Sequence, residues 1–183
     1  DSEWGGFGAA PKFPSTMNID LLLRSNATHP NAAALHVSTT SLDAMASGGI
    51  YDHLGGGFAR YSVDREWLVP HFEKMLYDQA LLVRVYLHAY QVTQYPRYKQ
   101  VVEETINYVL RDLTHQDGGF FSAEDADSAD ESGHHHEGWF YTWTPHEVRE
   151  LFDAELSAEI FEWYGMTDAG NFMESTLYPS NGS

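Results

Sequence analysis

Three short glycine-aromatic motifs divide the chain and constrain its fold more than any other feature. They begin at Gly5, Gly48 and Gly118, and each opens a loop rich in aromatic residues. The second and third follow segments with helical periodicity, and a pair of helical segments lies between them. Repeated helix pairs with loops gathered at one end are typical of an α/α toroid. Because 183 residues supply only about half of such a ring, we expect an incomplete ring or one completed by another chain.

Hydrophobic periodicity predicts four main helices in the first two thirds of the chain. The third, with Pro70 in its first turn, is apolar nearly all round and should be buried on every side. The fourth has one apolar stripe and should lie at the surface. The four predicted segments are residues 15–26, 31–47, 71–94 and 96–115.

Shorter elements are predicted around these helices. Residues 50–51 and 58–61 could pair as two short strands across three consecutive glycines. Residues 139–143 alternate weakly and predict a short strand. Thr144 followed by Pro145 and Glu147 has the pattern of a capping box and begins a short helix.

The predicted fold class is therefore all-α, a partial (α/α)6 toroid with short β-hairpins in its loops. A last helix should run from about Asp153 to Tyr164 and stop at Gly165. We expect one partial toroid domain over residues 1–172 and a loosely ordered tail over residues 173–183.

The composition excludes several classes of function. The net charge is −17, with 27 acidic and 10 basic residues, so nucleic acid is not an expected partner. No apolar run approaches the ~20 residues that span a bilayer, and we expect no membrane association and a cytoplasmic location. Cysteine is absent, which excludes disulfides and thiolate chemistry. Abundant carboxylates with three lysines also suit a protein adapted to high salt.

Charged residues gather near the start of the third predicted helix. His71, Lys74 and Asp78 are spaced to share one side of a helix, with Glu73 and Tyr77 on an adjacent side. Charges on a buried helix must be paired or must face a cavity. A cavity would make His71 and Glu73 acid–base candidates, whereas pairing would make the group an internal ion-pair network.

A second carboxylate group consists of Glu124, Asp125 and Asp127. Paired carboxylates cleave glycosidic bonds, although a solvated acidic loop has the same composition. The three consecutive histidines at residues 134–136 cannot all point at one ion in regular structure. We therefore expect a surface run there and no metal site.

Aromatic residues accompany both charged groups, among them Tyr61, Trp67 and Tyr77. Flat rings beside carboxylates suit sugar-like ligands, which offer apolar faces and many hydroxyls. The alternative is that the rings fill the core, which is the commoner use of aromatic side chains.

Four sequence strings carry a resemblance to a known family. GGFGAAPKFP, GGIYDHLGGGFARYSVDREWLVPHFEKMLYDQALL, SAEDADS and EGWFYTW look like the thioredoxin-domain-containing family related to the spermatogenesis-associated thioredoxin-like protein. The similarity covers residues 4–171. It implies a six-hairpin α/α toroid like that of N-acylglucosamine 2-epimerase and the six-hairpin glycosidases. It also implies two partners in the full-length protein, an N-terminal thioredoxin-like domain and the remaining toroid helices.

The resemblance implies a set of site residues by position. The motif residues that match are His53, Arg60, Tyr61, His71, Glu73, Lys74, Tyr77, Asp78, Glu124, Asp125 and Asp127. Two departures bear on function. The thioredoxin-like part is missing, so no redox role is expected of this chain, and the second half of the toroid is absent, so a catalytic mouth that needs it would be incomplete.

Two hypotheses follow for the function. The first is a carbohydrate-active domain, epimerase-like or glycosidase-like, that acts on a small sugar-like ligand without a cofactor. Its expected catalytic residues are His53, His71, Glu73 and Asp125. Its expected substrate-binding residues are Arg60, Tyr61, Trp67, Lys74, Tyr77, Asp78, Glu124 and Asp127. The second hypothesis is a binding or scaffolding module that performs no chemistry.

Overall fold

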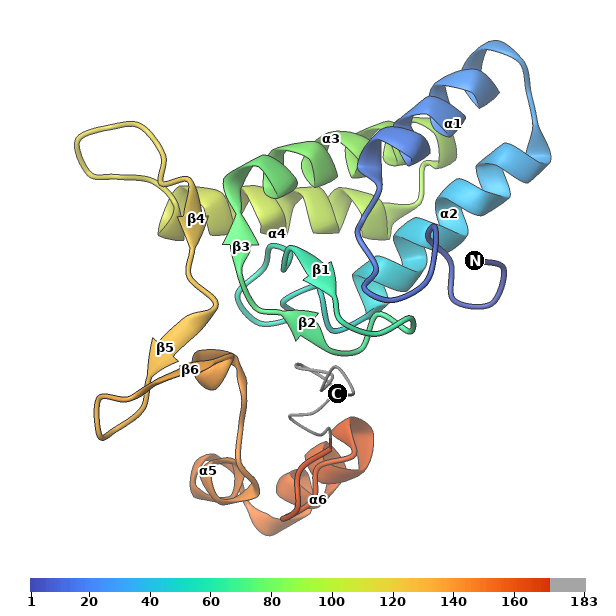
Figure 1. Ribbon diagram of the computed structural model, residues 1–183. Coiled ribbons are helices and arrows are strands. Elements are labelled where there is room, and N and C mark those ends of the chain that lie inside the picture. Colours follow the sequence, from blue (N-terminus) through green and yellow to red (C-terminus); the bar gives the residue numbers. More distant parts are fainter. Residues whose placement is uncertain (172–183) are drawn as a thin grey trace, which may run out of the picture. The chain divides into compact units, whose positions relative to one another are not determined.

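The computed structural model describes residues 1–171 and divides into two compact units (Figure 1). The first unit comprises residues 1–127, and the second begins at Ser128. The tail predicted for residues 173–183 lies outside the described residues. Each unit is treated by itself below.

Four helices build the first unit, and three of them lie where periodicity predicts. These are α1 (Thr16–Thr28), α2 (Ala32–Ser47) and α4 (Pro96–Asp112). Asn31 caps α2 by accepting hydrogen bonds from the backbone N–H groups of Ala33 and Ala34. The central helix is α3 (Leu76–Thr93), which packs against both α1 and α4, while α1 also packs against α2 (Figure 1).

The predicted start of the third helix at His71 is wrong. Residues 70–71 form strand β2 (Pro70–His71), which pairs with β1 (Tyr61–Ser62). Residues 74–75 form β3 (Lys74–Met75), which pairs with β4 (Ala123–Glu124). Strand pairing outweighs the local signal of a proline at a helix start. His71 and Lys74 therefore precede α3, and the argument that placed them with Asp78 on one helix side fails.

The expectation that this helix is buried on every side is also wrong within residues 1–171. One face of α3 is buried, and its members include Leu82, Val85 and Tyr86. Leu87 and Val92 are exposed at 40% and 38%. Arg84 and Gln91 lie on the same exposed side as Leu87, so this side of α3 is mixed in character among the described residues.

The core lies between these helices and the loop that joins α2 to α3. A chain of aromatic contacts runs through it, from Tyr51 to Phe58, on to Tyr86, and then to Tyr98 on α4. Tyr51 and Phe58 form an antiparallel bridge, as predicted for the short strands on either side of the three glycines. The loop is therefore part of the core and not a surface excursion.

Gly57 shows why this loop needs glycine. Its φ is +80°, a conformation that L-residues with side chains rarely adopt. A Cβ atom there would lie 2.5 Å from the ring of Tyr108 on α4. Gln79 of α3 binds Phe58, the residue after Gly57. The Gln79 side-chain amide accepts a hydrogen bond from Phe58 N at 2.8 Å and donates one to Phe58 O at 2.7 Å. Backbone and side chain together thus press the loop against α3 and α4.

Up to residue 171, the second unit contains two short strands, a 3-10 helix and two α-helices. Strand β5 (Asp127–Ala129) begins at the unit boundary and pairs with β6 (His135–Glu137). The 3-10 helix η1 (Trp139–Tyr141) follows, so the strand predicted for residues 139–143 is wrong. Gly138, with a φ of 75°, turns the chain into this helix. The helices α5 (Pro145–Leu151) and α6 (Ala154–Tyr164) confirm the prediction.

The capping box at α5 is present as predicted. Thr144 Oγ1 accepts from Glu147 N at 3.2 Å, and Glu147 Oε2 accepts from Thr144 N at 2.7 Å. This reciprocal arrangement satisfies two backbone donors at the start of the helix.

Candidate active site

Arg60 and Glu73 form a pair where the α2–α3 loop passes the start of α3. Arg60 N donates to Glu73 O at 2.8 Å, and its Nη1 donates to Glu73 Oε2 at 2.9 Å. The Arg60 side chain is 40% exposed and that of Glu73 is 27% exposed. Backbone and side-chain bonds together fix the Glu73 carboxylate at a site that solvent can still reach.

His71 lies beside the same carboxylate. Its Nε2 is 3.8 Å from Glu73 Oε2, and its ring stacks on Tyr61 with centroids 4.8 Å apart and planes inclined by 17°. Tyr61 and His71 are direct partners across β1 and β2, which explains the stacking. An imidazole held flat against a ring and next to a carboxylate is suited to proton transfer.

Tyr77 and Asp78 in the first turn of α3 complete the group. Burial raises the pKa of Asp78 to about 6; the positive charge of Arg60 opposes this shift, and the negative charge of Glu73 adds to it. Hydrogen bonding to Tyr77 and to Glu73 raises the pKa of Arg60. We call the set the Arg60 cluster; its members are Arg60, Tyr61, His71, Glu73, Tyr77 and Asp78.

Lys74 and Trp67 lie in the core of the first unit. Lys74 Nζ donates to Asp52 Oδ2 at 2.8 Å and to Gly56 O at 3.0 Å. Burial alone would raise the pKa of the Asp52 carboxyl. The positive charge of Lys74 and its hydrogen bond outweigh this effect, and the pKa is lowered. Trp67 is fully buried and donates from Nε1 to Trp4 O at 3.0 Å. In this structure both residues hold the loop in place and face away from solvent.

The carboxylates of residues 124–127 make different contacts. Glu124 Oε2 accepts from the Tyr108 hydroxyl at 2.6 Å. Asp125 is exposed, and its Oδ1 accepts from the backbone N–H of Asp127 at 3.1 Å. Asp127 is exposed as well. Within residues 1–171, the hydrogen bond of Asp125 stays inside its own turn, and no described contact joins it to His71 or Glu73.

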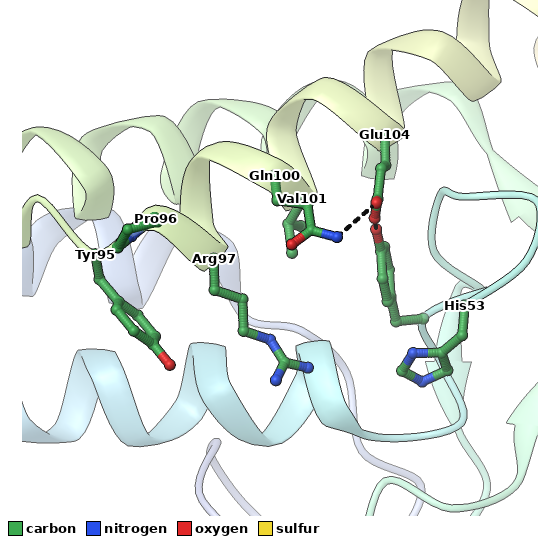
Figure 2. A pocket seen from close by; sticks show the side chains of 8 residues that line it. His53, Tyr95, Pro96, Arg97, Gln100, Val101 and Glu104 are labelled. Atoms are coloured by element: carbon green, nitrogen blue, oxygen red, sulfur yellow. Dashed lines mark hydrogen bonds between the residues drawn. The ribbon is translucent and has the colours of Figure 1, made fainter.

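His53 lines a separate pocket of about 480 Å³, shown in Figure 2. Its Nε2 lies 3.0 Å from Gly48 O, and Arg97 donates to Ala46 O at 2.7 Å. Cationic or donor side chains at the carboxyl end of a helix stabilise it, and both contacts lie at the end of α2. The pocket is lined by Tyr51, His53, Tyr95, Pro96, Arg97, Gln100, Val101 and Glu104.

Glu104 organises the other wall of this pocket. Its Oε2 accepts a hydrogen bond from the Tyr51 hydroxyl, and its Oε1 accepts from Gln100 Nε2 at 2.8 Å (Figure 2). Burial and the hydrogen bond to Glu104 raise the pKa of Tyr51 well above its ordinary value. The structure thus places the two predicted catalytic histidines in different groups, His53 with Tyr51 and His71 with Glu73.

The histidine run lies in an exposed hairpin of the second unit. Asp130 accepts hydrogen bonds from Ser132, from His134 N and from His136 Nε2, and these bonds, Ser132 foremost, lower its pKa to about 2. Among residues 1–171, no group of three or more His, Asp or Glu side chains is arranged to hold a metal ion.

Sequence reasoning missed three residues that fix the loops of the first unit. Asp52 is the partner of Lys74, Gln79 fastens Phe58, and Tyr108 binds Glu124. None of the three carries a local sequence signal, because each has its partner in another segment of the chain.

Comparison with solved structures identifies the class of fold. A cellobiose 2-epimerase from Bacillus thermoamylovorans matches with a TM-score of 0.63 at 13% identity, over 90% of this chain and 48% of that one. A D-mannose isomerase matches with a TM-score of 0.55 at 20% identity, over 66% and 30% of the two chains. The chain is therefore an all-α, partial (α/α)6 toroid with short antiparallel hairpins.

Sequence comparison narrows the relationship. Human spermatogenesis-associated protein 20 is 44% identical over 189 residues, which cover 96% of this chain and 24% of that protein. An uncharacterized Caenorhabditis elegans protein, B0495.5, is 37% identical over 96% of this chain and 26% of its own length. The resemblance found in the sequence is thus confirmed: the chain is related to spermatogenesis-associated protein 20 and spans about a quarter of its length.

No family model matches the sequence. Among residues 1–171, no helix is both long enough and apolar enough to cross a membrane.

Proposed function

We propose that this chain supplies part of an acid–base site that isomerises or epimerises a small sugar. The observation that carries the proposal is the position of His71, stacked on Tyr61 and next to a Glu73 carboxylate that Arg60 holds. Solved proteins named as sugar epimerases and a sugar isomerase share the fold, which supports the choice of substrate class.

The proposed chemistry is a proton transfer at the carbon next to the sugar carbonyl. His71 removes that proton and leaves an enediolate: the electron pair of the broken C–H bond forms a C=C bond, and the negative charge moves to the carbonyl oxygen. Protonation of the same carbon on its other face, by solvent, gives an epimer. Protonation of the neighbouring carbon, with the hydroxyl proton passing to the former carbonyl oxygen, gives the isomer. Glu73 stabilises the imidazolium that forms, because its carboxylate lies 3.8 Å from Nε2.

Ligand positioning falls to the remaining members of the Arg60 cluster. Arg60 and Tyr77 are partly exposed and can exchange hydrogen bonds with hydroxyls. Lys74 and Trp67, predicted to bind substrate, act in this proposal by holding the loop. His53, Glu124, Asp125 and Asp127 remain candidates for a part of the site that the rest of the longer protein would complete.

Two alternatives stay open. Cleavage of a glycosidic bond would need two facing carboxylates, and residues Glu124, Asp125 and Asp127 supply the candidates. The second alternative is a module that binds a ligand or a partner without catalysis. The ion pair between Arg60 and Glu73 favours this alternative, because such pairs can also have a purely structural role. In either case we propose that the full-length protein adds an N-terminal thioredoxin-like domain and the missing toroid helices.

Sugar binding by the whole natural protein tests the proposal. Calorimetric titration with D-mannose, D-glucose, D-fructose and cellobiose should detect binding of at least one of these sugars. The His71→Gln variant should no longer convert the sugar that binds. His115→Gln is a matched control, because His115 also lies beside a carboxylate, 3.6 Å from Asp117, and against a ring, that of Phe121. Absence of binding to every sugar, or equal loss in the control, contradicts the proposal.

A further inference from the structure

Arg97 differs from the other lysines and arginines in its charge partners. Each of the others forms an ion pair with an aspartate or a glutamate, whereas Arg97 forms none among residues 1–171. Acidic residues outnumber basic ones by 27 to 10, so carboxylate partners are plentiful in this chain. A half-buried guanidinium group without such a partner is therefore unusual here, because it is costly to remove a charge from water unless it is paired.

The Arg97 side chain lines the pocket of about 480 Å³ described above. Arg97 lies in the first turn of α4, and its Nη2 donates to Ala46 O at 2.7 Å. His53 Nε2 lies 3.0 Å from Gly48 O, which is two residues further along at the end of α2. Figure 2 shows the Arg97 side chain extending toward the end of α2, with Tyr95 on one side and His53 on the other. Two hydrogen-bonding side chains are thus fixed beside one open volume.

The contact with α2 uses little of the bonding capacity of Arg97. A guanidinium group has five N–H donors, and the hydrogen bond to Ala46 occupies one of them. Within residues 1–171, Nε and Nη1 make no described hydrogen bond and are not among the buried atoms without a partner, so solvent reaches both. The carboxyl end of a helix carries only about half a negative charge, and His53 shares it. Donors and positive charge therefore remain available to a ligand.

Glu104 is the one carboxylate among the lining residues, and it does not neutralise Arg97. It lies seven residues further along α4, which is about 10 Å of helix rise. Its two oxygens accept hydrogen bonds from Tyr51 and from Gln100, which hold it on the other wall (Figure 2). The pocket therefore has a cation at one end and a carboxylate at the other. This arrangement favours an anionic group of single charge at the Arg97 end.

We infer that this pocket binds a small organic carboxylate. The ligand carboxylate accepts hydrogen bonds from Arg97, whose planar guanidinium group matches the spacing of two carboxylate oxygens. The body of the ligand lies against Tyr95, which is 48% exposed, and against Pro96 and Val101. A phosphate group fits less well, because its additional negative charge shares the pocket with Glu104. No lining residue belongs to the Arg60 cluster, so the carboxylate site does not depend on the proposed action on sugars.

Calorimetric titration of the whole natural protein with benzoate and with benzamide tests this site. The two probes are similar in shape, and only benzoate carries a charge. Benzoate should bind at least about 10-fold more tightly than benzamide, because a charge-assisted hydrogen bond is stronger than a neutral one. It should also bind more tightly than inorganic phosphate. All titrations need the same ionic strength, about 0.15 M, because a net charge of −17 responds to any added salt.

Substitutions of Arg97 separate ligand binding from its contact with α2. Arg97→Met should weaken benzoate binding at least about 10-fold. Arg97→Lys keeps the charge but loses the planar group, and it should weaken binding about 3- to 10-fold. Arg111→Met is the matched control, because Arg111 also lies on α4 and donates to a loop carbonyl, Gly55 O at 2.8 Å, but already pairs with Asp112. It should bind benzoate as the unaltered protein does.

Several results would contradict a carboxylate site at Arg97. They are equal binding of benzoate and benzamide, binding of neither, or tighter binding of phosphate. A lower melting temperature as the sole effect of Arg97→Met would assign Arg97 to the end of α2 alone. If Arg97→Met does not fold, Arg97→Lys decides, and an affinity for benzoate equal to that of the unaltered protein would overturn the inference.

Discussion

At the scale of single residues, Lys74 shows how a charge can serve the fold. Its side chain is 4% exposed, its ammonium group meets Asp52 at 2.8 Å, and it lies 4.3 Å from the centre of the Tyr108 ring. Removing one partner of a buried pair leaves the other charge uncompensated. The strand–loop junction around Asp52 therefore depends on this lysine.

We predict that Lys74→Met lowers the free energy of unfolding by about 3 kcal/mol, as measured by urea denaturation. Lys99→Met is the control, because the Lys99–Glu103 pair is more than half exposed and should contribute less than about 0.5 kcal/mol. Equal effects of the two substitutions would show that Lys74 is not the structural anchor described.

The titration of Asp78 predicts a dependence of stability on pH. Its pKa is raised from 3.8 to about 6 in the folded chain, so the folded state holds the proton more tightly than the unfolded state does. The stabilisation from the neutral carboxyl is complete below pH 4 and is lost as the pH rises through 6. For a half-buried group we expect a change of about 1 to 2 kcal/mol.

Asp78→Asn isolates this contribution, because asparagine does not titrate. The unfolding free energy of the variant minus that of the unaltered chain should increase between pH 4 and pH 7. A difference that stays constant over this range would mean that Asp78 titrates normally in the folded chain.

At the scale of elements, Gln79 joins α3 to the loop before it. Its amide pairs with both backbone groups of Phe58, which is fully buried. Gln79→Leu leaves a buried N–H and a buried C=O unpaired, so we predict a loss of about 3 kcal/mol in unfolding free energy. Gln100→Leu on α4 is the matched control, since its exposed hydrogen bond to Glu104 should be worth less than about 0.5 kcal/mol. A small effect at Gln79 would mean that the loop is held by packing alone.

Elements set by residues within one turn were predictable from the sequence, whereas short strands that depend on pairing were not. The capping box at Thr144 and the cap at Asn31 act within a few residues, and both helices begin where predicted. Strand β2 depends on pairing with Tyr61, and β3 on pairing with Glu124, and neither leaves a periodic signal. The start of α3 was misplaced for that reason.

The same distinction applies to the candidate site. The family motif predicted Arg60, His71 and Glu73, and the structure brings these three together. The motif did not distinguish them from the buried Lys74, and the aromatic pattern did not distinguish the buried Trp67 from Tyr61, because burial depends on partners from other segments. The three-dimensional structure is needed to distinguish a solvent-accessible side chain of the motif from one that is buried in the core.

At the scale of the whole molecule, the net charge of −17 dominates the surface. Like charges repel one another in the compact state, and added salt screens that repulsion. We predict that the melting temperature at pH 7 rises as sodium chloride is increased from 0.02 to 1 M. The rise should shrink near pH 4.7, the isoelectric point of the sequence. A melting temperature that does not rise with salt at pH 7 would contradict the adaptation to high salt inferred from the composition.

The most direct measurement for the proposed function is proton exchange followed by NMR in D₂O. The whole natural protein is incubated with D-mannose, D-glucose, D-fructose and cellobiose, and the hydrogen on the carbon next to the carbonyl is monitored. We predict that one sugar is converted to its epimer or isomer with deuterium at that carbon, and that His71→Gln slows the conversion at least about 100-fold. Conversion that proceeds unchanged in His71→Gln, or a protein that binds a sugar and converts none, would contradict the assignment of His71 as the group that moves the proton.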